Sequence, residues 1–166
     1  MRYQKFKASE VPGLYIMDST VMSEGDILGM ARQLSQDRLS KGRTLGTPTR
    51  TKDYLQALMR DYEHEVFAMI LLDAQHRVIR FEELFRGTVG ASSVYPREVV
   101  KTALAHNAVA LVLAHNHPSG ISTPSQADIQ CTEHLKTALS LVDIKVLDHI
   151  VVGREGCYSF AEQGQI

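Results

Sequence analysis

Several residue types that mark specialised protein classes are scarce in this chain of 166 residues. It has two cysteines, Cys131 and Cys157, which lack the paired spacing of a disulfide framework or of a Cys-x-x-Cys metal clip. Such sparse cysteines suit a reducing compartment. No stretch approaches the roughly 18 consecutive apolar residues of a membrane span, and no apolar segment follows the basic N-terminal residues. We therefore expect a cytoplasmic protein with no membrane association.

An excess of charge of one sign is also missing. The chain has 18 lysine and arginine residues against 19 aspartate and glutamate residues, a formal net charge of -1. This balance gives no field over the whole molecule that would hold a polyanion, so it argues against a dedicated DNA-coating protein. With 44% apolar residues, a chain of this length can bury a core without disulfides or a structural metal.

Local signals predict helices that alternate with strands. Ser23 to Asp26 and Ser125 to Asp128 both have the Ser-x-x-Asp form of a helix start. The apolar run from Val66 to Leu72 is short enough for a strand covered on both faces. The predicted helices span about residues 23–42, 50–62, 96–107 and 125–142, and the predicted strands about 66–72, 77–85, 108–114, 144–152 and 157–160. We expect an α/β fold in which residues 44–166 form one domain, a mixed β-sheet flanked by helices, and residues 1–43 form an N-terminal helical extension.

Two histidines stand where a buried strand is predicted to end. Residues two apart on a strand point to the same side, so His115 and His117 can direct both imidazoles at one metal ion. Tetrahedral zinc needs its nitrogen ligands only about 3.3 Å apart. Pro118 and Gly120 turn the chain, and Asp128 can return from the first turn of the following helix as a carboxylate ligand. Three protein ligands leave a fourth position open, which is typical of a catalytic zinc site.

Each of these residues taken alone has an ordinary structural interpretation. A single histidine is most often a core or surface residue, and Ser-x-x-Asp is most often a capping box. The combination favours a metal site, because only a metal explains two histidines on one face before a compact loop and a carboxylate at a helix start.

The spacing His-x-His, seven residues, then Ser-x-x-Asp resembles the signature of the JAMM (MPN-plus) metalloprotease family. Over about residues 44–166 the sequence is similar to the RadC-like branch of that family, in its short form without an N-terminal region of the helix-hairpin-helix type. The segments that carry this resemblance are Glu83-Leu84-Phe85-Arg86-Gly87-Thr88, Val94-Tyr95-Pro96-Arg97-Glu98-Val99, His115-Asn116-His117-Pro118-Ser119-Gly120 and Asp148-His149-Ile150-Val151-Val152.

The resemblance implies an MPN (JAMM-like) domain with Zn²⁺ on His115, His117 and Asp128. It also implies hydrolysis of an amide bond in a peptide or protein substrate, by attack of a zinc-bound water. Ser125 would help to hold the oxyanion of the tetrahedral intermediate. Of the candidate general bases Glu65, Glu82 and Glu83, the family pattern favours Glu65, which opens the apolar strand after the first helix of the domain.

Two other functions stay open at this point. One is a DNA-associated repair factor or nucleic-acid-processing enzyme, and the other is a non-catalytic interaction module that keeps the fold. The pair Asp148-His149 would suit support of the metal site from behind, although a structural role is favoured. The remaining histidines are expected at the surface or in satisfied positions: His64, His76, His106 and His134. Arg86, Arg97 and Lys101 form at most a modest basic rim.

Overall fold

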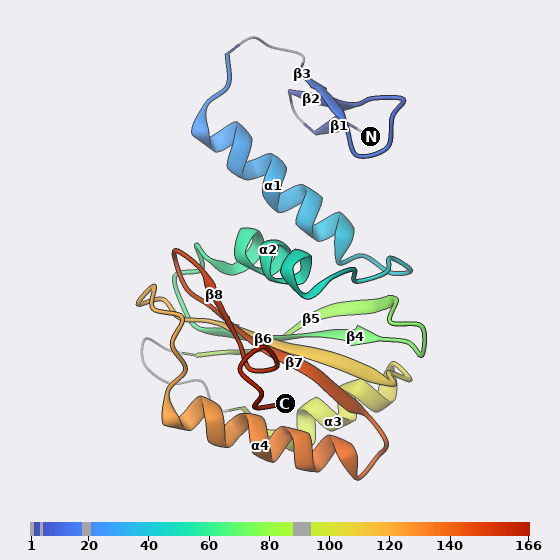
Figure 1. The fold of residues 1–166 in the computed structure, drawn as a ribbon, viewed down its shortest axis with the longest axis vertical. Helices are drawn as coiled ribbons and strands as arrows, with labels where there is room; N and C mark the ends of the chain where they lie inside the picture. Colours follow the sequence, from blue (N-terminus) through green and yellow to red (C-terminus); the bar gives the residue numbers. More distant parts are fainter. Residues whose placement is uncertain (1, 4, 18–20, 88–93) are drawn as a thin grey trace.

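The computed structural model describes residues 2–3, 5–17, 21–87 and 94–166. Its N-terminal part is a small antiparallel sheet of three strands, β1 (Arg2–Tyr3), β2 (Phe6–Ala8) and β3 (Tyr15–Met17), followed by helix α1 (Glu24–Arg38). Figure 1 shows this sheet at one end of the molecule, joined to the rest by α1. Helix α1 packs on α2 (Pro48–Met59), and Arg32 pairs with Asp61 at 2.7 Å.

The central element is a mixed sheet of five strands in the order β5-β4-β6-β7-β8. Strand β4 (Val66–Leu72) is antiparallel to both β5 (Val78–Arg86) and β6 (Ala110–Asn116). Strand β6 is parallel to β7 (Lys145–Val152), which is antiparallel to β8 (Cys157–Ser159). A parallel pair needs a crossover, and helix α4 (Gln126–Ser140) provides it between β6 and β7.

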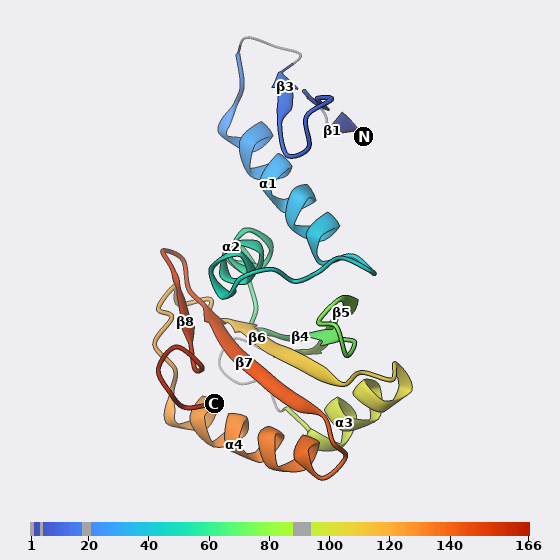
Figure 2. The same cartoon turned by 45° about the vertical axis from the view of Figure 1, so that its right-hand side comes forward.

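Helices cover both faces of this sheet, which is why β4 and β6 are buried at every position and are apolar except for His115 and Asn116 at the end of β6. Helix α2 lies on one face, while α3 (Pro96–Ala105) and α4 lie on the other (Figure 2). The side chains alternate accordingly: Ile70 and Val112 belong to the core under α2, and Met69 and Leu113 to the core under α3 and α4. Burying each large aliphatic side chain contributes about 1.5–3 kcal/mol.

The α/β class, the mixed sheet and the flanking helices agree with the prediction. The extension before residue 44 contains the predicted helix, but it is not helical throughout, because residues 2–17 contribute three short strands. Strands of two or three residues are too short to produce a detectable alternation of apolar and polar positions. Helix α2 also begins earlier than expected, at Pro48, where Thr47 accepts a hydrogen bond from the backbone of Arg50 and Pro48 occupies the first turn.

Among the residues that the structure describes, none of the helices combines the length and the apolar composition that a crossing of the bilayer requires.

Candidate metal centre

The centre lies at the end of β6, where side chains alternate between the two faces of the sheet. His115 points toward the α4 side, and the next residue, Asn116, points toward the α2 side. His117 follows the strand directly, and its backbone N–H still donates to the carbonyl of Val152 at 2.9 Å. Both imidazoles therefore face the start of α4, as the His-x-His spacing predicts.

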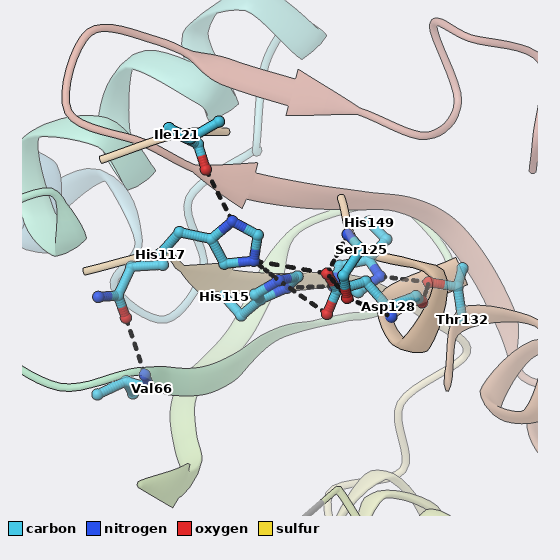
Figure 3. A network of polar contacts seen from close by, with 9 residues as sticks. Val66, His115, His117, Ile121, Ser125, Asp128, Thr132 and His149 are labelled. Atoms are coloured by element: carbon cyan, nitrogen blue, oxygen red, sulfur yellow. Dashed lines mark hydrogen bonds and ion pairs between the residues drawn. The ribbon is translucent and has the colours of Figure 1, made fainter. Parts of the chain in front are cut away.

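Asp128 is brought to these histidines by the capping box that begins α4. Ser125 is the N-cap residue, and its hydroxyl accepts from the backbone N–H of Asp128 at 3.2 Å. In return, the Oδ2 atom of Asp128 accepts from the backbone N–H of Ser125 at 2.6 Å and from its hydroxyl at 2.7 Å. Asp128 is thus both a member of the capping box and a candidate ligand, because the cap fixes a carboxylate that also faces the two imidazoles (Figure 3).

The ligand atoms of His115, His117 and Asp128 all lie within 4.8 Å of one another. The Nε2 atoms of the two histidines are 3.0 Å apart. The Oδ1 atom of Asp128 lies 3.3 Å from Nε2 of His115, and its Oδ2 atom lies 3.5 Å from Nε2 of His117. Two imidazole nitrogens and one carboxylate oxygen are a usual ligand set for a divalent metal ion.

The hydrogen bonding of His117 supports this assignment. Its Nδ1 atom lies 2.7 Å from the carbonyl oxygen of Ile121, and because a carbonyl can only accept, Nδ1 carries the proton (Figure 3). In the neutral ring the lone pair is then on Nε2, 3.0 Å from Nε2 of His115. Two nitrogens at this separation need a cation or a proton between them, so the residues fit a metal ion.

The electrostatics of the cluster follow from its mixed charge. A hydrogen bond with Asp128 raises the pKa of His117, and partial burial opposes this shift. Burial alone would raise the pKa of Asp128, but its interactions with His115, His117 and Ser125 outweigh this and hold that pKa well below its usual range. Asp128 is therefore a carboxylate at neutral pH, as a metal ligand has to be.

A cavity of about 260 Å³ opens beside the ligands and includes Glu65. Glu65 directly precedes β4 and is half-buried. The cavity is also lined by Phe67, Val94 and Pro96 and by residues of α4, among them Gln130, Cys131 and His134. Burial, together with the charge of Asp128, raises the pKa of the Cys131 thiol to about 11, so at neutral pH it is a protonated wall residue.

The other two candidate bases lie elsewhere. Glu83 accepts a hydrogen bond from the Tyr62 hydroxyl at 2.6 Å and pairs with Arg86 at 3.3 Å. Glu82 pairs with Arg80 on the edge strand β5. Neither lines the cavity that His115 and Asp128 border, whereas Glu65 does. A larger cavity, about 680 Å³, lies between α2 and the β7–β8 turn and contains none of the candidate site residues.

Asn116 holds the segment that carries Glu65, a role that no local sequence pattern indicates. Its side-chain oxygen accepts from the backbone N–H of Val66 at 2.8 Å, and its side-chain nitrogen donates to the carbonyl of His64 at 3.1 Å. These contacts clamp the backbone on both sides of Glu65 from a buried position between the two histidines.

His149 on β7 contacts the candidate ligand His115 directly, although the sequence favoured a purely structural role for it. Its Nε2 atom lies 2.8 Å from Nδ1 of His115, and its Nδ1 atom lies 2.6 Å from the hydroxyl of Thr132. Burial, reinforced by the nearby histidines, lowers the pKa of His149 well below its usual value. The neighbouring Asp148 instead points to the other face, where it accepts from the Ser159 hydroxyl and from the backbone of Ala161.

The loop after His117 rests closely on the end of β7. Gly153 faces this loop so tightly that an added Cβ atom would lie 2.6 Å from the carbonyl oxygen of Gly120, and Arg154 donates to that same oxygen. Gly120 itself has a φ of +87°, which a side chain would strain. The two glycines thus allow the close approach that places Ile121 against His117.

The remaining charged and histidine residues have ordinary positions. His64 and His76 are exposed, His106 contacts the carbonyl of Thr102, and the exposed His134 borders the cavity. In the suggested basic rim, Arg86 and Lys101 are paired with Glu83 and Glu98.

The comparison with known proteins agrees with this geometry. Residues 45–165 match the family described as the RadC-like JAB domain. The chain is 56% identical to a UPF0758 protein of Vibrio cholerae over 85% of this chain and 89% of that protein. It is 54% identical to one of Nitrosococcus oceani, covering 92% and 67% of the two chains. It is also 56% identical to one of Thioalkalivibrio sulfidiphilus, covering 83% and 61%.

The name UPF0758 states no activity for these relatives, and the longer ones extend well beyond the matched part. The family match, however, includes the whole ligand cluster, the segment of Glu65 and the five-stranded sheet that joins them. The chain therefore belongs to the RadC-like JAB-domain family, the RadC-type branch of the JAMM proteins.

Proposed function

We propose that the protein is a zinc-dependent hydrolase of the metallopeptidase or isopeptidase type, which cleaves an amide bond in a peptide or protein. The observation that carries the proposal is the pair of Nε2 atoms of His115 and His117, 3.0 Å apart and beside the Asp128 carboxylate. His115 and Asp128 line the same cavity as Glu65.

Zn²⁺ is the metal that the donor set supports best. Two imidazoles and one carboxylate match its preferred ligands, and three protein ligands leave a position for water or substrate. A bound zinc ion supplies two effects, a lower pKa for a coordinated water and polarisation of a carbonyl group. His115, His117 and Asp128 would hold the ion, and the capping box would keep the Asp128 carboxylate oriented.

In this proposal Glu65 is the general base. Its carboxylate would take a proton from the attacking water and pass it to the leaving amine, a role that requires a held side chain within hydrogen-bond reach. The clamp by Asn116 on the flanking backbone supplies that restraint. Ser125 is proposed as an oxyanion donor, for which its hydroxyl would turn from Asp128 toward the substrate.

Metal analysis together with a cleavage assay tests the proposal. We expect about one zinc ion per chain, and we expect a His117→Ala variant to lose it because two ligands hold zinc poorly. A His76→Asn variant is the matched control, since His76 is exposed, lies outside the cluster and has a φ of 55° that asparagine tolerates.

The same preparations would be incubated with libraries of peptides and of lysine-linked isopeptides, with products detected by mass spectrometry. Cleavage by the zinc-loaded protein and not by His117→Ala supports the function. Equal zinc content in the two proteins would show that His117 is not a ligand.

A further inference from the structure

A chain of three hydrogen bonds lies behind the candidate metal centre. The hydroxyl of Thr132 lies 2.6 Å from the backbone carbonyl oxygen of Asp128 and 2.6 Å from Nδ1 of His149. The Nε2 atom of His149 in turn lies 2.8 Å from Nδ1 of His115. The chain therefore starts at the backbone of one candidate ligand and ends on the ring of another.

The direction of all three hydrogen bonds is fixed by the acceptor at one end, the backbone carbonyl oxygen of Asp128. A carbonyl oxygen can only accept, so the Thr132 hydroxyl donates its single proton to Asp128. The hydroxyl oxygen must then accept from Nδ1–H of His149. A neutral imidazole with its proton on Nδ1 is an acceptor at Nε2, so Nδ1–H of His115 donates to His149 and the lone pair of His115 lies on Nε2.

The surroundings of His149 keep it in this arrangement. Its side chain is buried, with 1% exposure, which disfavours a charged ring. The ring stacks on Phe160 at a centroid distance of 5.0 Å and meets the edge of Phe67 at 5.6 Å. The imidazole therefore has little room to turn, and its two nitrogens stay aligned with Thr132 and His115.

We propose that Thr132 and His149 are positioning residues that lock His115 as the Nδ1–H tautomer and so reserve its Nε2 lone pair for the metal ion. In its reference to a metal, this inference rests on the proposed function. Hydrogen-bond partners behind a histidine ligand fix both its tautomer and its orientation, and their loss commonly costs 10–100-fold in metal affinity. These three hydrogen bonds, called the relay below, also connect the end of β6 to the first turns of α4, the two elements that carry the candidate ligands.

The first experiment measures the tautomer without any metal. Long-range ¹H–¹⁵N NMR spectra of the metal-free protein, with His115 assigned by a His115→Gln variant, distinguish a protonated Nδ1 from a protonated Nε2. We expect the Nδ1–H form of His115 and of His149 in the native protein. A His115 ring protonated on Nε2 would overturn the proposal.

The second experiment measures zinc affinity in two matched pairs of variants. Thr132→Val keeps the shape of the side chain and removes the hydroxyl, whereas Thr132→Ser keeps the hydroxyl. His149→Phe removes both ring nitrogens, whereas His149→Gln offers one acceptor and one donor at a similar separation. We expect Kd for Zn²⁺ to rise about 10–100-fold in Thr132→Val and His149→Phe, with most of the loss absent in the Ser and Gln variants.

Circular dichroism of each metal-free variant identifies any that fails to fold. If His149→Phe does not fold, the comparison of Thr132→Val with Thr132→Ser still tests the proposal. An unchanged Kd in folded Thr132→Val would overturn the relay. If the native protein bound no zinc at all, the proposed function would fail, but the NMR spectra would still decide whether Thr132 and His149 lock the tautomer of His115.

Discussion

At the scale of single residues, Glu65 offers the sharpest test of chemistry. Glu65→Gln preserves the shape of the side chain but removes its ability to accept a proton. We expect this variant to retain zinc and to lower the rate of hydrolysis by roughly 10²–10⁴, the usual contribution of general acid–base catalysis. Zinc content and kcat/KM on a substrate found by the library assay would be measured together.

Glu83→Gln is the matched control, because Glu83 is engaged by Tyr62 and Arg86 and does not line the cavity. It should keep near-native activity. Full activity in Glu65→Gln beside an inactive Glu83→Gln would move the general base to β5.

A second residue-scale prediction concerns the clamp on the Glu65 segment. Asn116→Ala leaves the backbone N–H of Val66 buried without its acceptor. An unsatisfied buried donor costs about 1–3 kcal/mol, so we expect the free energy of unfolding to fall by that amount. Urea unfolding followed by circular dichroism measures the change, and hydrolysis should fall while zinc remains bound.

The control for Asn116→Ala is Gln56→Ala. This variant removes another side-chain amide that donates to the backbone, in this case to the carbonyl of Gly153 at 2.9 Å. That contact does not involve the backbone on either side of Glu65, so its loss should lower stability without lowering activity in the folded protein. Equal activity in native protein and Asn116→Ala would contradict the role of the clamp.

At the scale of elements, helices α1 and α4 begin with the same capping box, Ser23 with Asp26 and Ser125 with Asp128. Only the second lies at the candidate metal centre. Replacing either serine by alanine should lower the free energy of unfolding by about 0.5–2 kcal/mol, the usual value of a helix cap. We expect Ser125→Ala in addition to weaken zinc binding, because it frees the Asp128 carboxylate, and Ser23→Ala to leave zinc binding unchanged.

Denaturation curves and zinc titrations on the two variants separate these effects. Equal zinc affinity in Ser23→Ala and Ser125→Ala would show that the cap does not orient the ligand.

The elements that could be predicted from the sequence are those whose signals are local and strong. The apolar runs Val66–Leu72 and Ala108–Ala114 predict buried strands, and the structure has β4 at Val66–Leu72 and β6 at Ala110–Asn116, both buried. The start of α4 follows from its Ser-x-x-Asp pattern. Strands β1 to β3 were missed because they are only two or three residues long.

The same distinction applies to the site. His115, His117 and Asp128 are close in sequence, so strand alternation and a helix start suffice to predict that they meet. His149 and Asn116 act through contacts with distant segments, β6 and the residues before β4 respectively. Only the pairing of β6 with β7 and β4 brings those segments together, and no local pattern encodes it. The Asp148-His149 pair was the one available signal for His149.

At the scale of the whole molecule, the balance of charge predicts weak binding to nucleic acid. The net charge is -1, and Arg86 and Lys101 of the suggested basic rim are paired to carboxylates, so neither the whole molecule nor this rim offers a strong positive field that would release counterions from phosphates. We expect labelled single- and double-stranded DNA to bind no tighter than micromolar near physiological salt. Titrations at two salt concentrations measure this, and submicromolar affinity that falls steeply with salt would favour the DNA-associated function.

The three ligand residues lie on one continuous segment, from the end of β6 to the first turn of α4, while Glu65 comes from the start of β4. The proposed metal binding and the proposed proton transfer are therefore encoded by separate parts of the chain. Under the proposed function, a single change at Glu65 would leave a metal-loaded binding protein with the same substrate surface. In that proposal, one substitution exchanges catalysis for recognition and leaves the fold and the candidate metal centre intact.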